Sequence, residues 1–208
     1  MNNKDIKLID TFINIKQNKE LLDSIIKIQN NINIYADSKV IAIATAEDDI
    51  SLEIVARALS EVYALQEQST LIIDCNMYNP RLNNLFCKEN FEVGLNDIID
   101  ESDDYNKLIN HITGNLDAVF AKNTNYPTKI FKSKKYFDFI CRVKEKYEHI
   151  ILIMPSIVEH QDILLRKDLI TSTLLVARKN RVSKKNLFDS IQILKADNIP
   201  YVCTIYLK

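Results

Sequence analysis

Short segments that are apolar throughout alternate along the chain with segments whose apolar residues recur at helical spacing. The first kind predicts strands, at 39–45, 70–76, 149–155, 172–179 and 201–207, with one more in "NLDAVFA". The second kind predicts helices, at 50–65, 132–147 and 184–198, with shorter ones in "PRLNNLF" and "GLNDIIDE". Strands without polar positions are buried on both faces. The pattern therefore predicts an α/β fold with three αβα layers and a mostly parallel sheet.

The start of the chain has the same helical pattern without a strand. Ile6, Ile9, Phe12 and Ile13 form one apolar stripe, and a second stripe runs from 21 to 28 beyond the polar "KQNKE". A length of 208 residues suits one domain. We therefore expect a single domain over 1–208 with an N-terminal helical segment at 1–36.

Composition and charge are those of an ordinary globular protein, with 47% apolar residues, 26% charged residues and a net charge of −1. No overall positive field would recruit nucleic acid. The apolar runs are too short to span a bilayer, and the first residues lack the plan of a signal peptide, so we expect a cytoplasmic protein. Scattered cysteines and histidines predict no metal site. The basic "KSKK" in 132–147 fits a solvated helix face better than a patch for an acidic partner.

Candidate chemistry lies in the loops that follow the strands, because ligands bind at the carboxyl ends of a parallel sheet. The loop "TAEDDIS" lies between the first strand and the helix at 50–65, where a phosphate-binding loop would lie. Such a loop requires glycines and a lysine. This one has neither, and the whole chain contains only Gly94 and Gly114.

The order and spacing of several motifs nevertheless resemble one family. From about Leu22 onward, "VIAIATAEDDISLEIVARALS", "LIIDCNMYNP", "LNNLF", "GLNDII" and "YEHIILIMPS" follow one another as in the bacterial tyrosine kinases of capsule and exopolysaccharide synthesis. These kinases, of the CpsD/CapB/Wzc type, are a branch of the MinD/ParA-like P-loop ATPases with deviant Walker motifs. The resemblance implies a P-loop NTPase-like fold.

The resemblance places degenerate residues at the phosphate-binding positions. The glycine, lysine and serine of the family's loop correspond to Ser51, Leu52 and Glu53. An earlier glycine corresponds to Asp49, which follows Glu47 and Asp48. A loop for a polyanion would thus have carboxylates and no cation, and these repel phosphate.

The other two motifs of the nucleotide site are altered as well. The second acidic motif retains Asp74 but has Asn76 for its second acid and Tyr78 for its arginine. The Walker B acid corresponds to Ile153, and only Asp162 remains further along. The resemblance therefore implies vestigial nucleotide-site positions, no cofactor and no metal. On this reading Leu52→Ala is expected to be neutral for stability.

Two further features of the family are altered. The oligomer-forming E-x-x-R-x-x-R motif corresponds to Asp23, Ile26 and Gln29, and the tyrosine cluster at the family's C-terminus has no counterpart. We therefore expect a monomer or a small assembly.

The leading hypothesis is a pseudokinase that acts as a regulatory or scaffolding module of polysaccharide synthesis. By the resemblance, its partner is the cytoplasmic tail of a membrane chain-length regulator or an active kinase paralogue, and it reaches the membrane only through that partner. The alternatives are an active kinase or ATPase with unorthodox ligands, and a MinD/ParA-like positioning scaffold. Simpler structural roles remain open for these residues. Asp74 is also compatible with a cap or a salt bridge, and Arg81 and Arg178 are compatible with surface charges. The three loop acids, Glu47, Asp48 and Asp49, are compatible with a helix cap.

Overall fold

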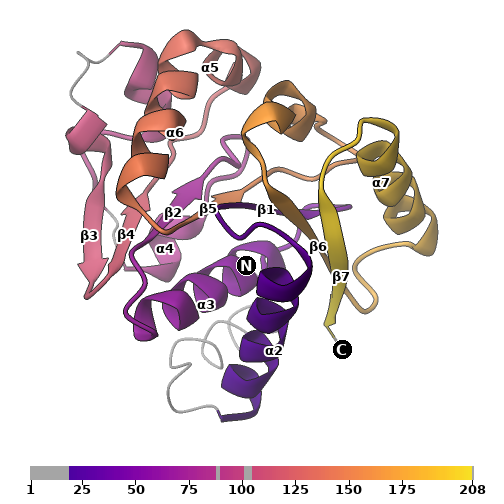
Figure 1. Ribbon diagram of the computed structural model, residues 1–208. Coiled ribbons are helices and arrows are strands. Elements are labelled where there is room, and N and C mark those ends of the chain that lie inside the picture. The colour runs from indigo at the N-terminus through magenta and orange to yellow at the C-terminus, as the bar shows by residue number, and fades with distance from the viewer. Residues whose placement is uncertain (1–18, 88–89, 101–104, 208) are drawn as a thin grey trace.

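Seven strands form one sheet in the computed structural model, which describes residues 19–87, 90–100 and 105–207 (Figure 1). The strand order is β3-β4-β2-β5-β1-β6-β7. The strands are β1 (Val40–Thr45), β2 (Thr70–Asp74), β3 (Asn110–Thr113), β4 (Leu116–Val119), β5 (His149–Ile153), β6 (Ser172–Arg178) and β7 (Tyr201–Leu207). Every residue of β1, β2 and β5 is buried, as the apolar runs predicted.

All neighbouring strands are parallel except β3, which pairs with β4 in an antiparallel hairpin. Gly114 has a φ of 49° in the turn between them, a conformation that glycine adopts without steric cost. The sequence pattern indicated β4 but not β3. The reason is that β3 lies at the edge of the sheet, with alternately exposed residues and no apolar run.

One face of the sheet is covered by α2 (Lys19–Tyr35), α3 (Ser51–Leu65) and the short α4 (Leu82–Leu85) (Figure 1). Their buried side chains join Ile41, Ile43 and Ile151 in one apolar cluster. Of the expected N-terminal helical segment, residues 1–18 lie outside the described residues. The stripe at 21–28 belongs to α2.

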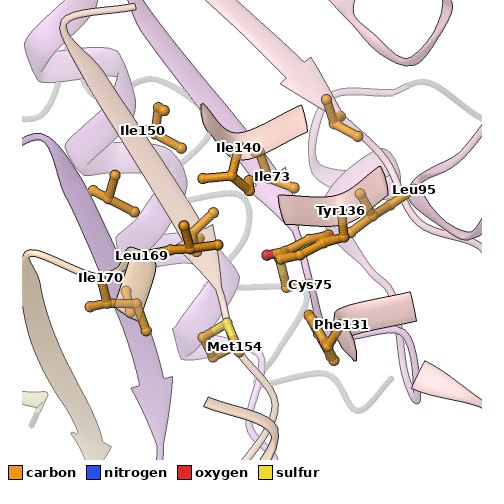
Figure 2. Packing of buried hydrophobic residues seen from close by; sticks show 14 of the residues in the cluster. Ile73, Cys75, Leu95, Phe131, Tyr136, Ile140, Ile150, Met154, Leu169 and Ile170 are labelled. Atoms are coloured by element: carbon orange, nitrogen blue, oxygen red, sulfur yellow. The ribbon is translucent and has the colours of Figure 1, made fainter. Parts of the chain in front are cut away.

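The opposite face is covered by α5 (Pro127–Lys132), α6 (Lys134–Lys146) and α7 (Lys184–Ala196). The 3-10 helices η1 (Leu95–Ile99), η2 (Tyr105–Leu108) and η3 (Asp162–Leu169) add to this layer. Figure 2 shows Tyr136 of α6 directed at Cys75, with its hydroxyl 3.6 Å from the sulfur. Helices on both faces of a mostly parallel sheet confirm the predicted α/β fold.

The helix expected at 132–147 is α6, which begins at Lys134, but the short α5 before it was not expected. Ser133 separates the two helices: it is extended, with φ −68° and ψ 147°, and ends α5 while it caps α6. Its Oγ accepts a hydrogen bond from the Tyr136 N–H and donates one to the Ile130 carbonyl. Six residues are too few for α5 to show a clear helical period of apolar positions. Within the described ranges, no helix combines the length and apolarity needed to cross a bilayer.

Leu52 contradicts the expectation of a neutral substitution. Its side chain is completely buried in the cluster of α2 and α3, together with Val55 and Leu59. The three residues stand at i, i+3 and i+7, so they share one face of α3. The position that resembles the family's lysine is therefore part of the hydrophobic core.

We predict that Leu52→Ala lowers the free energy of unfolding by about 2–5 kcal/mol, because it leaves a cavity under α3. The matched control is Leu65→Ala on the same helix, whose side chain is 43% exposed. That variant should change stability by about 0.5 kcal/mol or less. Urea denaturation of both variants measures the difference, and equal costs would contradict the placement of Leu52.

Candidate functional site

The candidate site lies at the carboxyl ends of β1, β2, β5 and β6, where the loops of an open parallel sheet meet. The backbone ties the first of these loops to the loop after β5. The Ile157 N–H donates to the Thr45 carbonyl at 2.9 Å, and the Met154 N–H donates to the Ile43 carbonyl at 2.8 Å. This rim contains most of the vestigial positions.

Arg81, from the loop after β2, lies at the centre of the rim. Its Nη2 is 2.6 Å from Oδ1 of Asp48 and 2.9 Å from Oε1 of Glu53, and its Nε donates to the same Glu53 oxygen at 3.0 Å. The guanidinium therefore joins the loop after β1 to the first turn of α3. A forked, planar donor suits two carboxylates at once.

Glu53 is the most unusual member of the site, because its side chain is completely buried. Burial raises the pKa of Glu53 to about 8, against the opposing charge of Arg81 and with a further contribution from Asp74. A buried carboxyl is tolerated when a partner charge accompanies it. Arg81 is that partner.

Asp74, at the end of β2, fixes the backbone that carries Arg81. Its Oδ2 accepts hydrogen bonds from the backbone N–H groups of Arg81 and Leu82, and its Oδ1 accepts one from the N–H of Asn76. Burial raises the pKa of Asp74 to about 6, while these N–H donors oppose the shift. Of the roles considered for Asp74, the structure supports the cap.

The other two loop acids contact the last residue of β6 and the start of α7. Oδ2 of Asp49 is 2.9 Å from Nη2 of Arg178, and its Oδ1 accepts the N–H of Ser51. Glu47 accepts the backbone N–H of Ser183 at 3.1 Å and the side-chain amide of Asn186 at 2.8 Å. These bonds, the backbone one foremost, lower the pKa of Glu47. A carboxylate is favoured there because it faces the N-terminus of α7.

The side chains of the remaining predicted positions do not join this network. Ile153 is fully buried at the end of β5, and Asn76 is buried just after β2. Asp162 is buried beside Thr128, whose hydroxyl donates to it at 3.4 Å. Nearby, the ring of Tyr78 stacks on His160 at a centroid distance of 3.6 Å, and burial raises the pKa of Tyr78 to about 12.

The residues at this rim do not fit a nucleotide with its magnesium ion. None of residues 46–50, all of which the structure describes, has a positive φ, whereas a nest of phosphate-binding N–H groups needs a left-handed residue. Leu52 is in the core, and the Glu53 carboxyl stands where the family has a metal-binding hydroxyl. Glu53 Oε2 has no hydrogen-bond partner among the described residues, and a carboxyl at this position offers a phosphate no cation.

The side chains of the rim do not form a site for a metal ion by itself either. Across residues 19–87, 90–100 and 105–207, no three histidine, cysteine, aspartate or glutamate side chains are grouped so that they could hold an ion. What the rim can do chemically is hold its own loops together through paired charges.

For the two arginines that organise the rim, the structure does not support the alternative of ordinary surface charges. The side chain of Arg81 is 18% exposed and that of Arg178 is 11% exposed, and both pair with buried acids. One feature of the sequence could have indicated that cations pair with this loop. The loop "TAEDDIS" has an excess of acids, which required cations from elsewhere in the chain. The sequence alone does not say which cations these are.

No protein-family model matches the chain, and no curated protein matches its sequence. Solved structures do match its fold. The kinase domain of the Escherichia coli tyrosine kinase ETK has a TM-score of 0.86 and 20% identity, over 94% of this chain and 79% of that one. The chimerical protein CapA2B2 has a TM-score of 0.80 and 19% identity, over 87% and 82%. The Pyrococcus furiosus cell division ATPase MinD has a TM-score of 0.67 and 14% identity, over 81% and 71%. The chain thus shares the fold of bacterial tyrosine kinase domains and of MinD.

We predict that Arg81→Ala destabilises the protein by about 3 kcal/mol above about pH 8, where the Glu53 carboxyl is ionised, because the substitution leaves that buried carboxylate without its partner. In a Glu53→Gln background the same substitution should cost clearly less. The control is Lys167→Ala, which breaks an exposed pair with Asp197 and should cost at most about 1 kcal/mol. Equal costs for Arg81→Ala in both backgrounds, measured by urea denaturation, would contradict the pairing.

The site also predicts a pH dependence of stability. Because the pKa values of Glu53 and Asp74 are raised to about 8 and about 6, the folded state binds protons more tightly than the unfolded state. This contribution is present below about pH 4 and is lost as the pH rises through 6 and then 8. The slope reaches about 1.4 kcal/mol per pH unit for one titrating group.

Glu53→Gln should remove the decline between about pH 6 and pH 8 and roughly halve its slope between about pH 4.5 and pH 6, where Asp74 still contributes. Other titrating groups, such as His149, are present in both proteins, so the difference between the two curves isolates Glu53. Parallel curves for the wild type and the variant would show that Glu53 does not titrate in this range.

Proposed function

We propose that this chain is a catalytically inactive member of the bacterial tyrosine kinase family that acts as a regulatory or scaffolding binding module. The observation that carries the proposal is Arg81 held between Asp48 and Glu53. In the family, phosphate and metal belong at that place, and here the protein's own charges satisfy one another. Retention of the complete fold around this rim supports a role in binding rather than in chemistry.

The alternative of an active kinase or ATPase with unorthodox ligands has no comparable support. It requires Asp74 as a base, but the Asp74 carboxyl is 1% exposed and accepts three backbone hydrogen bonds. Ile153 at the Walker B position offers no oxygen to a metal. Phosphoryl transfer depends on positioned cations around the phosphates, and the residues here supply carboxylates instead.

The partner we propose is the cytoplasmic tail of a membrane polysaccharide chain-length regulator or an active kinase paralogue, which implies a cytoplasmic location. No nucleotide, metal or other cofactor takes part in this role. The resemblance of "LNNLF" and "GLNDII" supports the kinase branch over a MinD/ParA-like scaffold. The TM-scores of 0.86 for the ETK kinase domain and 0.67 for MinD agree with that preference.

We predict that millimolar Mg-ATP and Mg-ADP leave the melting temperature unchanged, because the rim repels phosphate. A ligand at 100 times its dissociation constant would add about 2.7 kcal/mol, a shift of several degrees for a domain of this size. An active bacterial tyrosine kinase domain under the same conditions is the positive control. A clear shift for this protein would contradict the proposal.

A further inference from the structure

The charge of this chain is unevenly distributed, and two stretches are strongly positive: residues 178–185, with five basic residues and no acidic one, and the helical pair α5–α6. The segment from the start of α5 to the end of α6 has seven basic and two acidic residues, a net charge of +5. The whole chain has a net charge of −1, so the rest carries −6. Between Asp117 and Asp138 there is no acidic residue at all.

Three lysines at the junction of the two helices form what we call the lysine patch: Lys129, Lys132 and Lys134. All three are exposed, and no acidic side chain among the described residues forms an ion pair with them. Two exposed aromatic side chains flank the patch. Tyr126, just before α5, is 72% exposed, and Phe137 in α6 is 36% exposed.

The stability of the helices explains only part of the patch. Lys129 and Lys132 lie in the last turn of α5, where the helix dipole favours a positive charge. Lys134 lies in the first turn of α6, where the dipole favours acids and disfavours a positive charge. Ser133 already caps that helix through the N–H of Tyr136. Lys134 therefore adds positive potential to the surface at a small local cost.

We propose that the lysine patch is a docking surface for a membrane that contains anionic lipid. Lysines attract an anionic leaflet, and exposed aromatic rings insert at the level of its headgroups. The patch lies on the outer surface of two helices, on the opposite side of the molecule from α2 and β7 (Figure 1). A groove of about 490 Å³ between α2 and β7 is therefore a separate feature of the surface, and none of the three lysines lines it. Because the lysines project from the outside of the helices, a flat and fluid surface suits them better than an extended acidic peptide does.

This inference does not depend on the proposed function, and it adds direct lipid contact to a protein expected to reach the membrane only through a partner. Each lysine near an anionic surface contributes about fivefold to partitioning. The three together give reversible binding, which suits a protein that has a second point of attachment.

The test is co-sedimentation of the whole chain with vesicles of phosphatidylcholine, with and without phosphatidylserine. We expect binding only with phosphatidylserine, and a loss of it near 1 M salt, where the screening length is about 3 Å. The triple variant K129Q/K132Q/K134Q should lower partitioning by about 100-fold. The matched control K19Q/K27Q/K195Q removes three exposed lysines from α2 and α7 and should bind nearly as the wild type does.

Several results would overturn the proposal. One is the absence of binding that depends on phosphatidylserine. Another is an equal loss in the two triple variants, which would trace the binding to net charge alone. Displacement of the protein from vesicles by polyglutamate at low concentration would assign the patch to an acidic peptide. The melting temperature of each variant confirms that it is folded.

Discussion

The carboxyl of Glu53 is buried at the start of α3, and much of the rim follows from the need to compensate it. A buried carboxylate without a partner is costly, so a cation has to reach it. Arg81 does so, and it can only do so if the chain after β2 turns back over α3. Asp74 holds that turn through the N–H groups of Arg81 and Leu82. The loops after β1 and β2 are therefore fixed relative to each other by one guanidinium and one carboxylate.

The same principle extends to the end of β6 and the start of α7. Asp49 pairs with Arg178, and Glu47 accepts hydrogen bonds at the start of α7. Buried ion pairs contribute little net stability compared with apolar packing, but the loss of one partner is strongly unfavourable. The network thus specifies how the loops lie more than it strengthens the fold. A phosphate could enter only if several of these pairs were broken together.

Much of the fold could be predicted from the sequence, because β1, β2 and β5 are apolar throughout and the helices have regular stripes. The edge strand β3 was missed since it has no buried face, and α5 was missed because its six residues are too few to show a helical period of apolar positions. The acids of the site were identified as candidates by their position after β1. Their partners were not, because Arg81 lies 33 residues from Asp48 and only the tertiary fold brings them together.

Leu52 shows a different kind of error. Its spacing with Val55 and Leu59 was sufficient to place it in the core, but the position was interpreted through the lysine that the family has there. Leu52 and Ile153 correspond to a phosphate-binding lysine and a Walker B acid, and both are fully buried in the same apolar cluster. On the proposed function, the two substitutions that remove the chemistry are also the two that add apolar side chains to the core. Because burial of these side chains contributes free energy of folding that no ligand has to supply, the fold can persist without a nucleotide. A lysine at position 52 would place an ammonium group in that core, while Glu53 is already paired with Arg81. A nucleotide site could therefore be built here only if the packing under α3 and the charges of the rim changed together.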